Sequence, residues 1–287
     1  MNGKIAAALL LTAAGISYEE NNRLTLCRLS VESSRLPKEF NGFSIVHLSD
    51  LHSKYFGSGK NRLLRRINQL APDLVCITGD LIDKRRYHRN GIAPALALCR
   101  ELAQERPVIL VSGNHEAAFP FYPELQRALE DIGVTVLENQ ALRFYREGAV
   151  LYIGGLQDPA FIRENRTAFR QEVFRLCREA KGDFTLLLCH RPELLEEYGA
   201  AGADLVLSGH AHGGQFRLPG AGPVWVPNQG LFPSLAQGVH RFGNTAMVVS
   251  RGLGNSLFPQ RLLNWPEVVF ITLNRQEPSL VKETGKK

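Results

Sequence analysis

Acidic and histidine residues recur in five short clusters along the sequence, and their side chains are of the types that bind divalent metals. The clusters are Asp50-Leu51-His52, Gly79-Asp80-Leu81-Ile82-Asp83, Gly113-Asn114-His115-Glu116, Cys189-His190 and Gly209-His210-Ala211-His212. Carboxylate, imidazole and amide groups together suit Mn²⁺, iron or Zn²⁺, and no thiolate is obviously involved. Two such ions about 3.5–4 Å apart would share a bridging carboxylate, activate a water and neutralise charge on a phosphoryl group. A pair of ions held by these clusters would therefore be suited to in-line displacement at phosphorus.

The third cluster combines a ligand with a group that could transfer a proton. Asn114 can bind a metal without adding charge, which leaves the adjacent His115 to protonate a leaving oxygen or to stabilise phosphoryl oxygens. Taken alone, Asp50, Asp80 or Asn114 would most often be a helix cap or a turn residue. That simpler explanation must hold independently at every cluster, so their shared pattern favours a metal centre.

Each cluster follows an apolar run that predicts a buried strand. The runs cover residues 43–48, 74–78, 108–111, 184–188 and, more briefly, 205–207. Ligands of open α/β sheets collect outside the carboxyl ends of the strands, so the clusters should meet there. Asp50 and His52 are two residues apart, so in extended backbone they would point to the same side.

Strands alternate with helices in the first part of the chain and follow one another in the last part. Helical spacing predicts helices at 61–70, 92–104, 123–132, 164–179 and 193–198, and only strands and turns after 214. Without repeats or low-complexity linkers, this order predicts one α/β domain over residues 41–275. Its expected architecture is a four-layer α-β-β-α sandwich of two mixed sheets flanked by helices.

The five motifs D-x-H, G-D-x-x-D, G-N-H-E, a lone histidine and G-H-x-H, in this order, resemble the calcineurin-like metallophosphoesterase superfamily. The wider segments HLSDLH, ITGDLID, SGNHE, GHAHGGQ and VSRGLGNS resemble its bacterial membrane-associated branch. That branch is similar to secreted or anchored phosphoesterases and to UDP-diacylglucosamine pyrophosphatases of the lipid A pathway. The resemblance spans roughly residues 40–275.

The resemblance implies a role for each matching residue and two divalent ions, Mn, Fe or Zn. The implied ligands of one ion are Asp50, His52 and His212. Those of the other are Asn114, His190 and His210, with Asp80 bridging both ions. His115 matches the catalytic histidine of the superfamily. Asp83 and Glu116 would steady histidine side chains, although Asp83 could equally be a solvated or helix-capping carboxylate.

The implied reaction is hydrolysis of a phosphodiester or pyrophosphate by direct attack of a metal-activated water. One alternative is a lipid-linked nucleotide pyrophosphatase of the UDP-diacylglucosamine type. Another, from a different class, is a non-catalytic metal-binding scaffold, which is disfavoured because no expected ligand is missing. Candidate phosphate contacts are Arg191, beside His190, and Arg85 and Arg86, in a basic stretch that could instead be a solvated loop.

The N-terminal segment is apolar and uncharged from residue 5 to residue 16, with Lys4 before it and Glu19 and Glu20 after it. A helix of this length, about 18 Å, is shorter than the ~30 Å hydrocarbon core of a bilayer. We therefore interpret residues 1–18 as a signal peptide or membrane anchor, with a helix packed on the domain as the alternative. Residues 19–40 would be a linker or edge strand, and 276–287 a charged tail. This places the protein at the extracytoplasmic face of the cell membrane, or outside the cell after signal cleavage.

Composition adds weak constraints on partners. The net charge of +6 favours anionic partners such as a phosphorylated small molecule or a lipid. Nucleic acid is not excluded, but no stretch interleaves aromatic residues with dense Lys and Arg. The five cysteines are odd in number and lack C-x-x-C spacing, which argues against a complete disulfide framework. The oligomeric state is not determined by these features.

Overall fold

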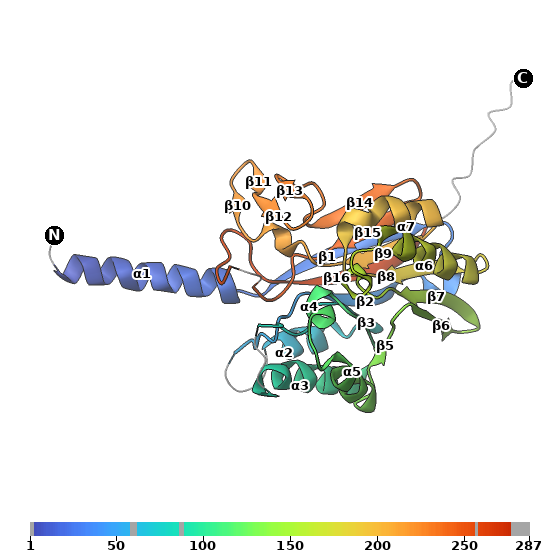
Figure 1. The fold of residues 1–287 in the computed structure, drawn as a ribbon, viewed down its shortest axis with the longest axis horizontal. Coiled ribbons are helices and arrows are strands. Elements are labelled where there is room, and N and C mark those ends of the chain that lie inside the picture. The colour runs from blue at the N-terminus through green and yellow to red at the C-terminus, as the bar shows by residue number, and fades with distance from the viewer. Residues whose placement is uncertain (1–2, 58–61, 86–88, 256–257, 277–287) are drawn as a thin grey trace, which may run out of the picture.

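The apolar runs form two six-stranded mixed sheets (Figure 1). The structure is a computed structural model, and it describes residues 3–57, 62–85, 89–255 and 258–276. In spatial order, the first sheet contains β1 (Thr25–Ser33), β16 (Glu267–Arg275), β2 (Phe43–Leu48), β3 (Leu74–Thr78), β4 (Val108–Val111) and β5 (Thr135–Val136). The second contains β14 (Gly238–Phe242), β15 (Thr245–Val249), β9 (Leu205–Ser208), β8 (Phe184–Leu188), β7 (Ala149–Gly155) and β6 (Gln140–Arg146).

Each sheet has a parallel centre with antiparallel pairing toward one or both edges. Strands β2 to β5 are parallel, and β16 pairs antiparallel with β2. In the second sheet, β15, β9, β8 and β7 are parallel, whereas β14 and β6 are antiparallel to their neighbours. The carboxyl ends of β2, β3 and β4 therefore share one edge of the first sheet, and those of β8 and β9 share one edge of the second.

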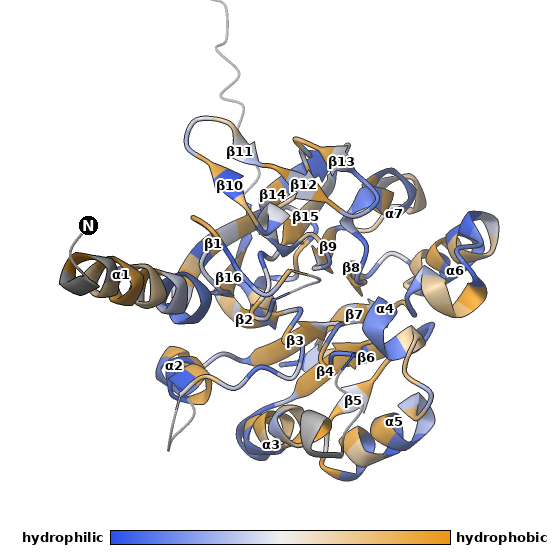
Figure 2. Ribbon diagram, turned by 60° about the vertical axis from the view of Figure 1, so that its left-hand side comes forward, coloured by the Kyte–Doolittle hydropathy of each residue, from blue (hydrophilic) through white to orange (hydrophobic). Residues whose placement is uncertain are grey.

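Three apolar cores separate four layers, which confirms the predicted sandwich. Helices α2 (Arg62–Leu70), α3 (Arg89–Glu105) and α5 (Tyr122–Asp131) cover the first sheet, and α6 (Arg166–Glu179) and α7 (Leu195–Ala201) cover the second. Along β8, Leu186 and Leu188 belong to the core between the sheets, whereas Leu187 packs toward α6 and α7. This alternation is the two-residue period of a strand buried on both faces. Figure 2 shows β3 and β4, central strands of the first sheet, as largely hydrophobic.

The predicted helices occur close to their expected positions, but α7 continues to Ala201, beyond the expected residue 198, and α3 differs at its start. This helix begins at Arg89, earlier than the expected residue 92, and it contains Pro94 in its interior. Proline lacks the backbone N–H that an interior position would donate, so the spacing around Pro94 predicted a later start. The short helical turns are η1 (Lys38–Phe40), α4 (Asn114–Ala117), η2 (Pro159–Ile162), η3 (Pro192–Leu194) and η4 (His212–Gly214).

Two small hairpins stand beside the second sheet. They are formed by β10 (Arg217–Leu218) with β11 (Gly222–Pro223), and by β12 (Trp225–Val226) with β13 (Gly230–Leu231). We refer to residues 215–232 as the hairpin lobe. It follows η4 directly, so it lies next to the last of the five clusters (Figure 1).

Helix α1 (Gly3–Asn22) extends away from the sandwich, and its apolar side chains are exposed (Figure 1). Its last turns are bound to the domain: Glu20 accepts hydrogen bonds from the Leu263 backbone and the Trp265 indole. Asn21 likewise contacts Pro259 and the backbone nitrogen of Arg261. Among the described residues, no helix combines the length and apolar content that crossing a bilayer requires.

Candidate metal centre

The five clusters meet where the carboxyl ends of the two sheets face each other. Loops of one sheet are tied together by backbone hydrogen bonds, such as Asp50 N to Gly79 O (3.0 Å) and Gly209 N to His190 O (3.1 Å). The two sheets are joined by the backbone nitrogen of His210, which donates to the Asp50 carboxylate at 3.1 Å. Tertiary structure thus closes a sequence gap of 160 residues at this point.

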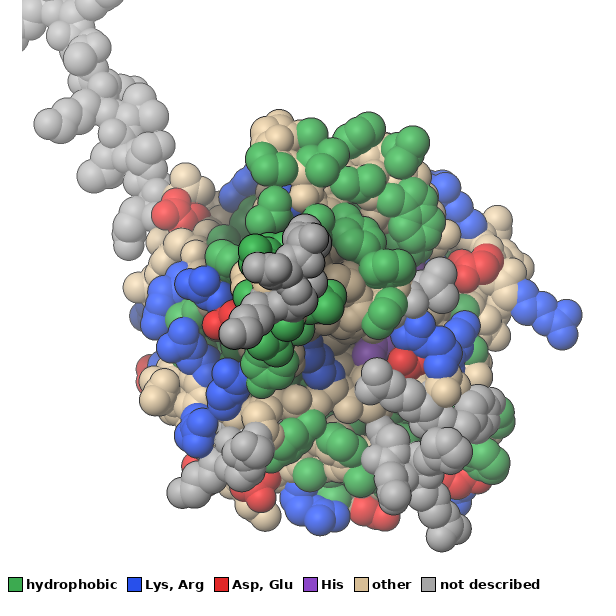
Figure 3. Space-filling model, turned by 90° about the vertical axis from the view of Figure 1, so that its left-hand side faces the viewer, with side chains coloured by type: hydrophobic (Ala, Val, Ile, Leu, Met, Phe, Trp, Pro, Cys, Tyr) green, Lys and Arg blue, Asp and Glu red, His purple; other side chains and the backbone are tan. Residues whose placement is uncertain are grey.

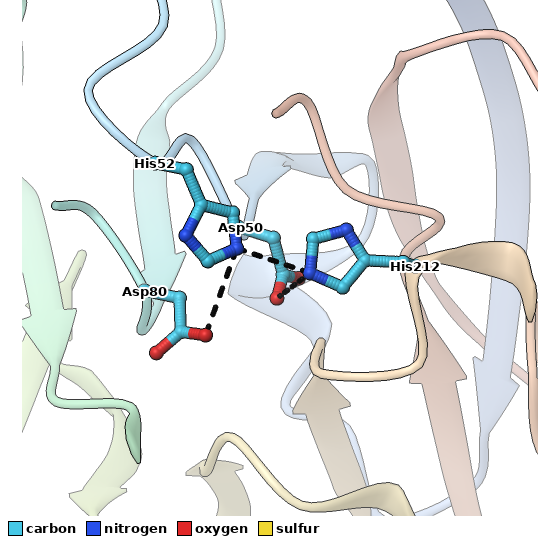
Figure 4. A group of neighbouring side chains, drawn as sticks. All are labelled: Asp50, His52, Asp80 and His212. Carbon is cyan, nitrogen blue, oxygen red and sulfur yellow. Dashed lines mark hydrogen bonds and ion pairs between the residues drawn. The ribbon is translucent and has the colours of Figure 1, made fainter. Parts of the chain in front are cut away.

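A first group of possible ligands contains Asp50, His52, Asp80 and His212, whose ligand atoms lie within 4.8 Å of one another. All four side chains are buried and point toward one another (Figure 4). His212 Nε2 is 3.2 Å from Asp50 Oδ1, and His52 Nε2 is 3.7 Å from Asp80 Oδ2. The two Nε2 atoms of His52 and His212 are 3.0 Å apart.

A second group contains Asp80, His190 and His210. His190 Nε2 lies 3.3 Å from Asp80 Oδ2 and 3.2 Å from His210 Nδ1. Asp80 belongs to both groups, so its carboxylate lies between two clusters of donor atoms. Asn114 is placed beside Asp80 by the hydrogen bond from the His115 backbone nitrogen to Asp80 Oδ1, at 2.8 Å.

Unsatisfied polar atoms show that these residues fit divalent cations. Asn114 Oδ1 is buried and has no hydrogen-bond partner among the described residues. Such an atom normally finds a partner, and an ion would provide one. The facing imidazole nitrogens and the two buried carboxylates of Asp50 and Asp80 equally need a positive charge between them. The donor set of histidine nitrogens and carboxylate and amide oxygens suits Mn²⁺, iron or Zn²⁺.

Five of the seven predicted ligands have left-handed backbone conformations. The φ angles are +52° at Asp50, +50° at His52, +50° at Asp80, +64° at His210 and +48° at His212. Only a few per cent of non-glycine residues have positive φ, because the Cβ atom then crowds the backbone. Such strain persists where surrounding structure enforces it, and it concentrates at functional sites. The positive φ angles turn these side chains inward immediately after their strands.

Comparison with known proteins agrees with this geometry. A model of the calcineurin-like phosphoesterase family matches residues 43–214, which include every residue of the two groups. The chain belongs to the calcineurin-like phosphoesterase family.

Several metallophosphoesterases resemble the chain over most of its length. The uncharacterized metallophosphoesterase YkuE of Bacillus subtilis is 31% identical over 282 residues, which cover 95% of this chain and 94% of the relative. An uncharacterized metallophosphoesterase of Aquifex aeolicus is 29% identical and covers 93% of this chain and 97% of itself. A Bos taurus protein called a transmembrane protein with metallophosphoesterase domain is 28% identical, over 85% of this chain and 56% of the relative. With its metal-ligand clusters, this calcineurin-like phosphoesterase is a metal-dependent phosphohydrolase that uses divalent ions.

In this phosphoesterase, the ring of His190 is oriented by a hydrogen bond through the nitrogen that faces away from the donor groups. His190 Nδ1 donates to the carbonyl oxygen of Thr78 at 2.7 Å, which directs its Nε2 toward Asp80. An imidazole fixed through one nitrogen presents the other as a ligand. Burial lowers the pKa of His52 to about 3, so the ring is neutral and one of its two nitrogens has a free lone pair. Burial also lowers the pKa of His190, but the charges of Asp80 and Asp50 outweigh it and raise the pKa to about 10. The carboxylates therefore stabilise positive charge at this point.

His115 lies at the edge of the first group, where its ring packs against that of His52 with centroids 4.5 Å apart. Its Nδ1 is 3.4 Å from Asp83 Oδ1 and 3.1 Å from the backbone nitrogen of Lys84. Burial lowers the pKa of His115, but the contact with Asp83 and the charge of Asp80 raise it above its ordinary value. Asp83 also accepts two hydrogen bonds from Arg85, at 2.8 Å each, so it positions both side chains.

The hydrogen bonds of Glu116 go to the backbone rather than to an imidazole of the described residues. Its carboxylate accepts hydrogen bonds from three backbone nitrogens, those of Asp80 and Gly113 at 2.7 Å and that of Ile82 at 3.1 Å. The backbone of α4 turns the Glu116 side chain back toward these amides rather than toward an imidazole. Burial and the charge of Asp80 raise the pKa of Glu116 to about 7, against the three donors.

The arginines expected to contact substrate phosphate differ in their surroundings. Arg191 is 4% exposed, and its guanidinium donates to Asp158 at 2.7 and 2.9 Å and to Glu164 at 2.9 Å. Three carboxylates, those of Asp158, Glu164 and Glu193, already neutralise this charge, which favours a structural role beside His210 over phosphate binding. Arg85 is partly exposed and bound by Asp83. Arg86 lies outside the described residues.

Two supporting residues escaped sequence reasoning. Arg261 is fully buried, donates to the carbonyl oxygen of Gly254, and places Nη2 3.5 Å from His212 Nδ1. Asn264 Nδ2 donates to the carbonyl oxygen of His212 at 2.6 Å. Both side chains hold η4 against the loop before β16. Their local sequence, RLLNW, gives no signal that would distinguish this loop from a solvated one.

Proposed function

We propose that this phosphoesterase hydrolyses phosphodiesters or pyrophosphates with two divalent ions, Mn, Fe or Zn, and that it acts at a membrane surface. The observation that carries the proposal is the position of Asp80, whose carboxylate belongs to both groups of donor atoms. A carboxylate in this position can bridge two ions at the spacing that in-line displacement at phosphorus requires.

We assign one ion to each of the two groups of donor atoms. Asp50, His52 and His212 would hold one ion, Asn114, His190 and His210 would hold the other, and Asp80 would contact both. When bound, the ions supply Lewis-acid charge for the phosphoryl oxygens and lower the pKa of a water. The buried carboxylates and imidazoles fix the position of that charge and exclude bulk solvent from it.

His115 is proposed as the catalytic histidine. Asp83 contacts its Nδ1 and raises its pKa, so the ring can hold a proton on Nε2. From the edge of the first group, Nε2 donates this proton to the oxygen that leaves phosphorus. Asp83 acts as a positioning residue, since it fixes the ring and favours the protonated form.

Action at a membrane is supported by helix α1. Its side chains at Leu9, Leu10 and Leu11 are 59%, 72% and 74% exposed, although leucine is usually buried. An apolar helix beside the site could insert into one leaflet without crossing it. The bovine relative is named a transmembrane protein, which favours a membrane location for this chain too, outside the cytoplasm as residues 1–18 suggest.

One test distinguishes the proposed function from two alternatives. A lipid-linked nucleotide pyrophosphatase would turn over a lipid-linked pyrophosphate faster than a soluble aryl phosphodiester. A non-catalytic scaffold would bind two ions and hydrolyse neither, but the buried, converging ligands favour an enzyme.

The test is hydrolysis of both substrates by protein loaded with Mn²⁺ or Zn²⁺, before and after Asp80→Asn. Loss of the bridging carboxylate should lower kcat by more than about a hundredfold, because changes behind the ligands alone can cost up to ~100-fold. Metal analysis should count two ions per chain in the parent protein and fewer in the variant. Asp131→Asn, at an exposed position ending α5, is the matched control. Turnover unchanged in Asp80→Asn would disprove the bridging role.

A further inference from the structure

A groove of about 180 Å³ opens beside the metal centre, and the proposed reaction does not use it. It begins at His212 and Ala211 and continues into the hairpin lobe. The apolar side chains that line it are those of Phe216, Val224, Trp225, Pro227 and Phe258. His212 therefore belongs both to the first group of donor atoms and to one end of this groove.

The walls of the groove are held in place by the protein itself. The rings of Phe216 and Phe258 meet edge to face, with centroids 5.0 Å apart. Gln215 Nε2 donates to the carbonyl oxygens of Phe258 and Gln260, at 2.8 and 2.9 Å, and ties the lobe to the loop before β16. A groove formed by fixed walls binds a ligand without first paying to order them.

The chemistry of the lining selects an apolar ligand. Among the described residues that line the groove, none is Lys, Arg, Asp or Glu, and the side chains that can form hydrogen bonds are those of His212, Gln215 and Trp225. His212 directs its Nε2 to Asp50, and Gln215 Nε2 is used within the wall. Ligand sites of this kind gain affinity by burying apolar surface, while polar groups at one end fix orientation.

The apolar surface continues beyond the mouth of the groove. Leu231, paired with Trp225 across the hairpin, is 68% exposed, and the adjoining Phe232 is 61% exposed. Leu262, which bridges to Phe216, is 42% exposed. Figure 3 shows hydrophobic side chains gathered over this face, next to α1 and above a small area of histidine surface. A long apolar chain could leave the groove along this surface.

We infer that the groove binds an aliphatic chain carried by the phosphorylated substrate, whose reacting phosphorus lies at the metal centre. The inference rests on the proposed function and names its substrate class, a phosphoester with an apolar substituent. Continuity with His212 favours a substituent of the substrate over a separate ligand. The volume admits a chain but not a helix of a second protein, which is about 10 Å across.

Binding of alkylphosphonates tests the groove without requiring turnover. Methyl-, butyl- and octylphosphonate would be titrated calorimetrically into the metal-loaded protein, below concentrations at which the chains aggregate. Affinity should rise about fourfold for each methylene buried, until the groove is full. The heat-capacity change of binding should become more negative with chain length, as burial of apolar surface requires.

Substitutions in the groove test whether the gain in affinity with chain length arises there. Val224→Phe fills the groove and should abolish the gain in affinity from methyl to octyl. Phe258→Ala, at a side chain that is 53% exposed, removes one wall and should reduce the gain. Tyr145→Ala is the control, since this tyrosine on β6 is 67% exposed and lies outside the groove.

Either of two results would overturn the inference: affinity independent of chain length in the parent protein, or an equal dependence in Val224→Phe. Failure of the proposed function would be seen separately, as chain-length-dependent binding without hydrolysis of any phosphoester.

Discussion

Glu116 shows that a side chain can shape this site through hydrogen bonds to the backbone, which its residue type alone does not predict. Glu116 is 1% exposed, and three backbone nitrogens from two loops donate to its carboxylate. These bonds hold the backbone of Asp80, the residue that both donor groups share. A side chain that belongs to neither donor group therefore determines where the Asp80 carboxylate lies.

Replacement of Glu116 by alanine should destabilise the fold strongly. Each buried N–H left without a partner costs about 1–3 kcal/mol, so Glu116→Ala should lower the free energy of unfolding by about 3 kcal/mol or more. Urea denaturation measures this difference. Glu124→Ala, on an exposed part of α5, should stay within about 0.5 kcal/mol of the parent. Equal stability of the two variants would mean that the three bonds contribute little.

At the scale of elements, the turn after each strand decides whether its ligand reaches the site. Gly79, between β3 and Asp80, has φ +85°, and a Cβ atom there would lie 2.7 Å from the backbone of Gly113. The same Cβ would be 2.8 Å from His190 Nδ1. The loops after β3, β4 and β8 can approach this closely only because residue 79 has no side chain.

A pair of glycines separates this steric requirement from backbone strain. Gly148 has the same φ of +85°, but nothing lies within 4 Å of a Cβ built there. Gly148→Ala should cost only the left-handed strain, about 1–2 kcal/mol. Gly79→Ala should cost about 2 kcal/mol more and also weaken metal binding, because His190 and Gly113 must move. Denaturation curves and metal titrations of both variants give the comparison, and similar losses in the two would refute the packing argument.

At the scale of the whole molecule, α1 connects a projecting apolar surface to the metal centre. Residues 3–16 contribute little to the domain, whereas Ser17, Glu20 and Asn21 hydrogen-bond to residues 255–265. The same stretch contains Arg261 and Asn264, which hold His212. A helix inserted in a lipid surface would therefore keep the site and its groove close to that surface.

Removal of residues 1–16 should separate membrane binding from the fold. This variant should no longer sediment with anionic phospholipid vesicles, because the exposed leucines are lost, and should still hydrolyse a soluble phosphodiester. Removal of residues 1–22 should in addition lower the melting temperature, since Glu20 and Asn21 lose their bonds. Vesicle sedimentation and thermal unfolding distinguish the two variants. Unchanged sedimentation after removal of residues 1–16 would exclude α1 as the membrane contact.

Local sequence patterns were enough to predict the types of candidate ligand, their order and the layered fold. Hydrophobic periodicity and strand-end placement are local properties, and they recur at Asp50, Asp80 and Asn114 in a pattern that chance does not produce. Local patterns also located the helices of the sandwich to within a few residues.

Which residues contact one another became known from the three-dimensional fold alone. In the fold, Asp80 lies between two donor groups, and Arg261 is buried next to His212. Asp158 neutralises the charge of Arg191, and backbone amides donate to the carboxylate of Glu116. The fold also formed the apolar groove from segments that are far apart in the sequence. These features depend on contacts between residues up to 160 positions apart. Such pairings follow from the packing of two whole sheets, which no local pattern of side chains specifies.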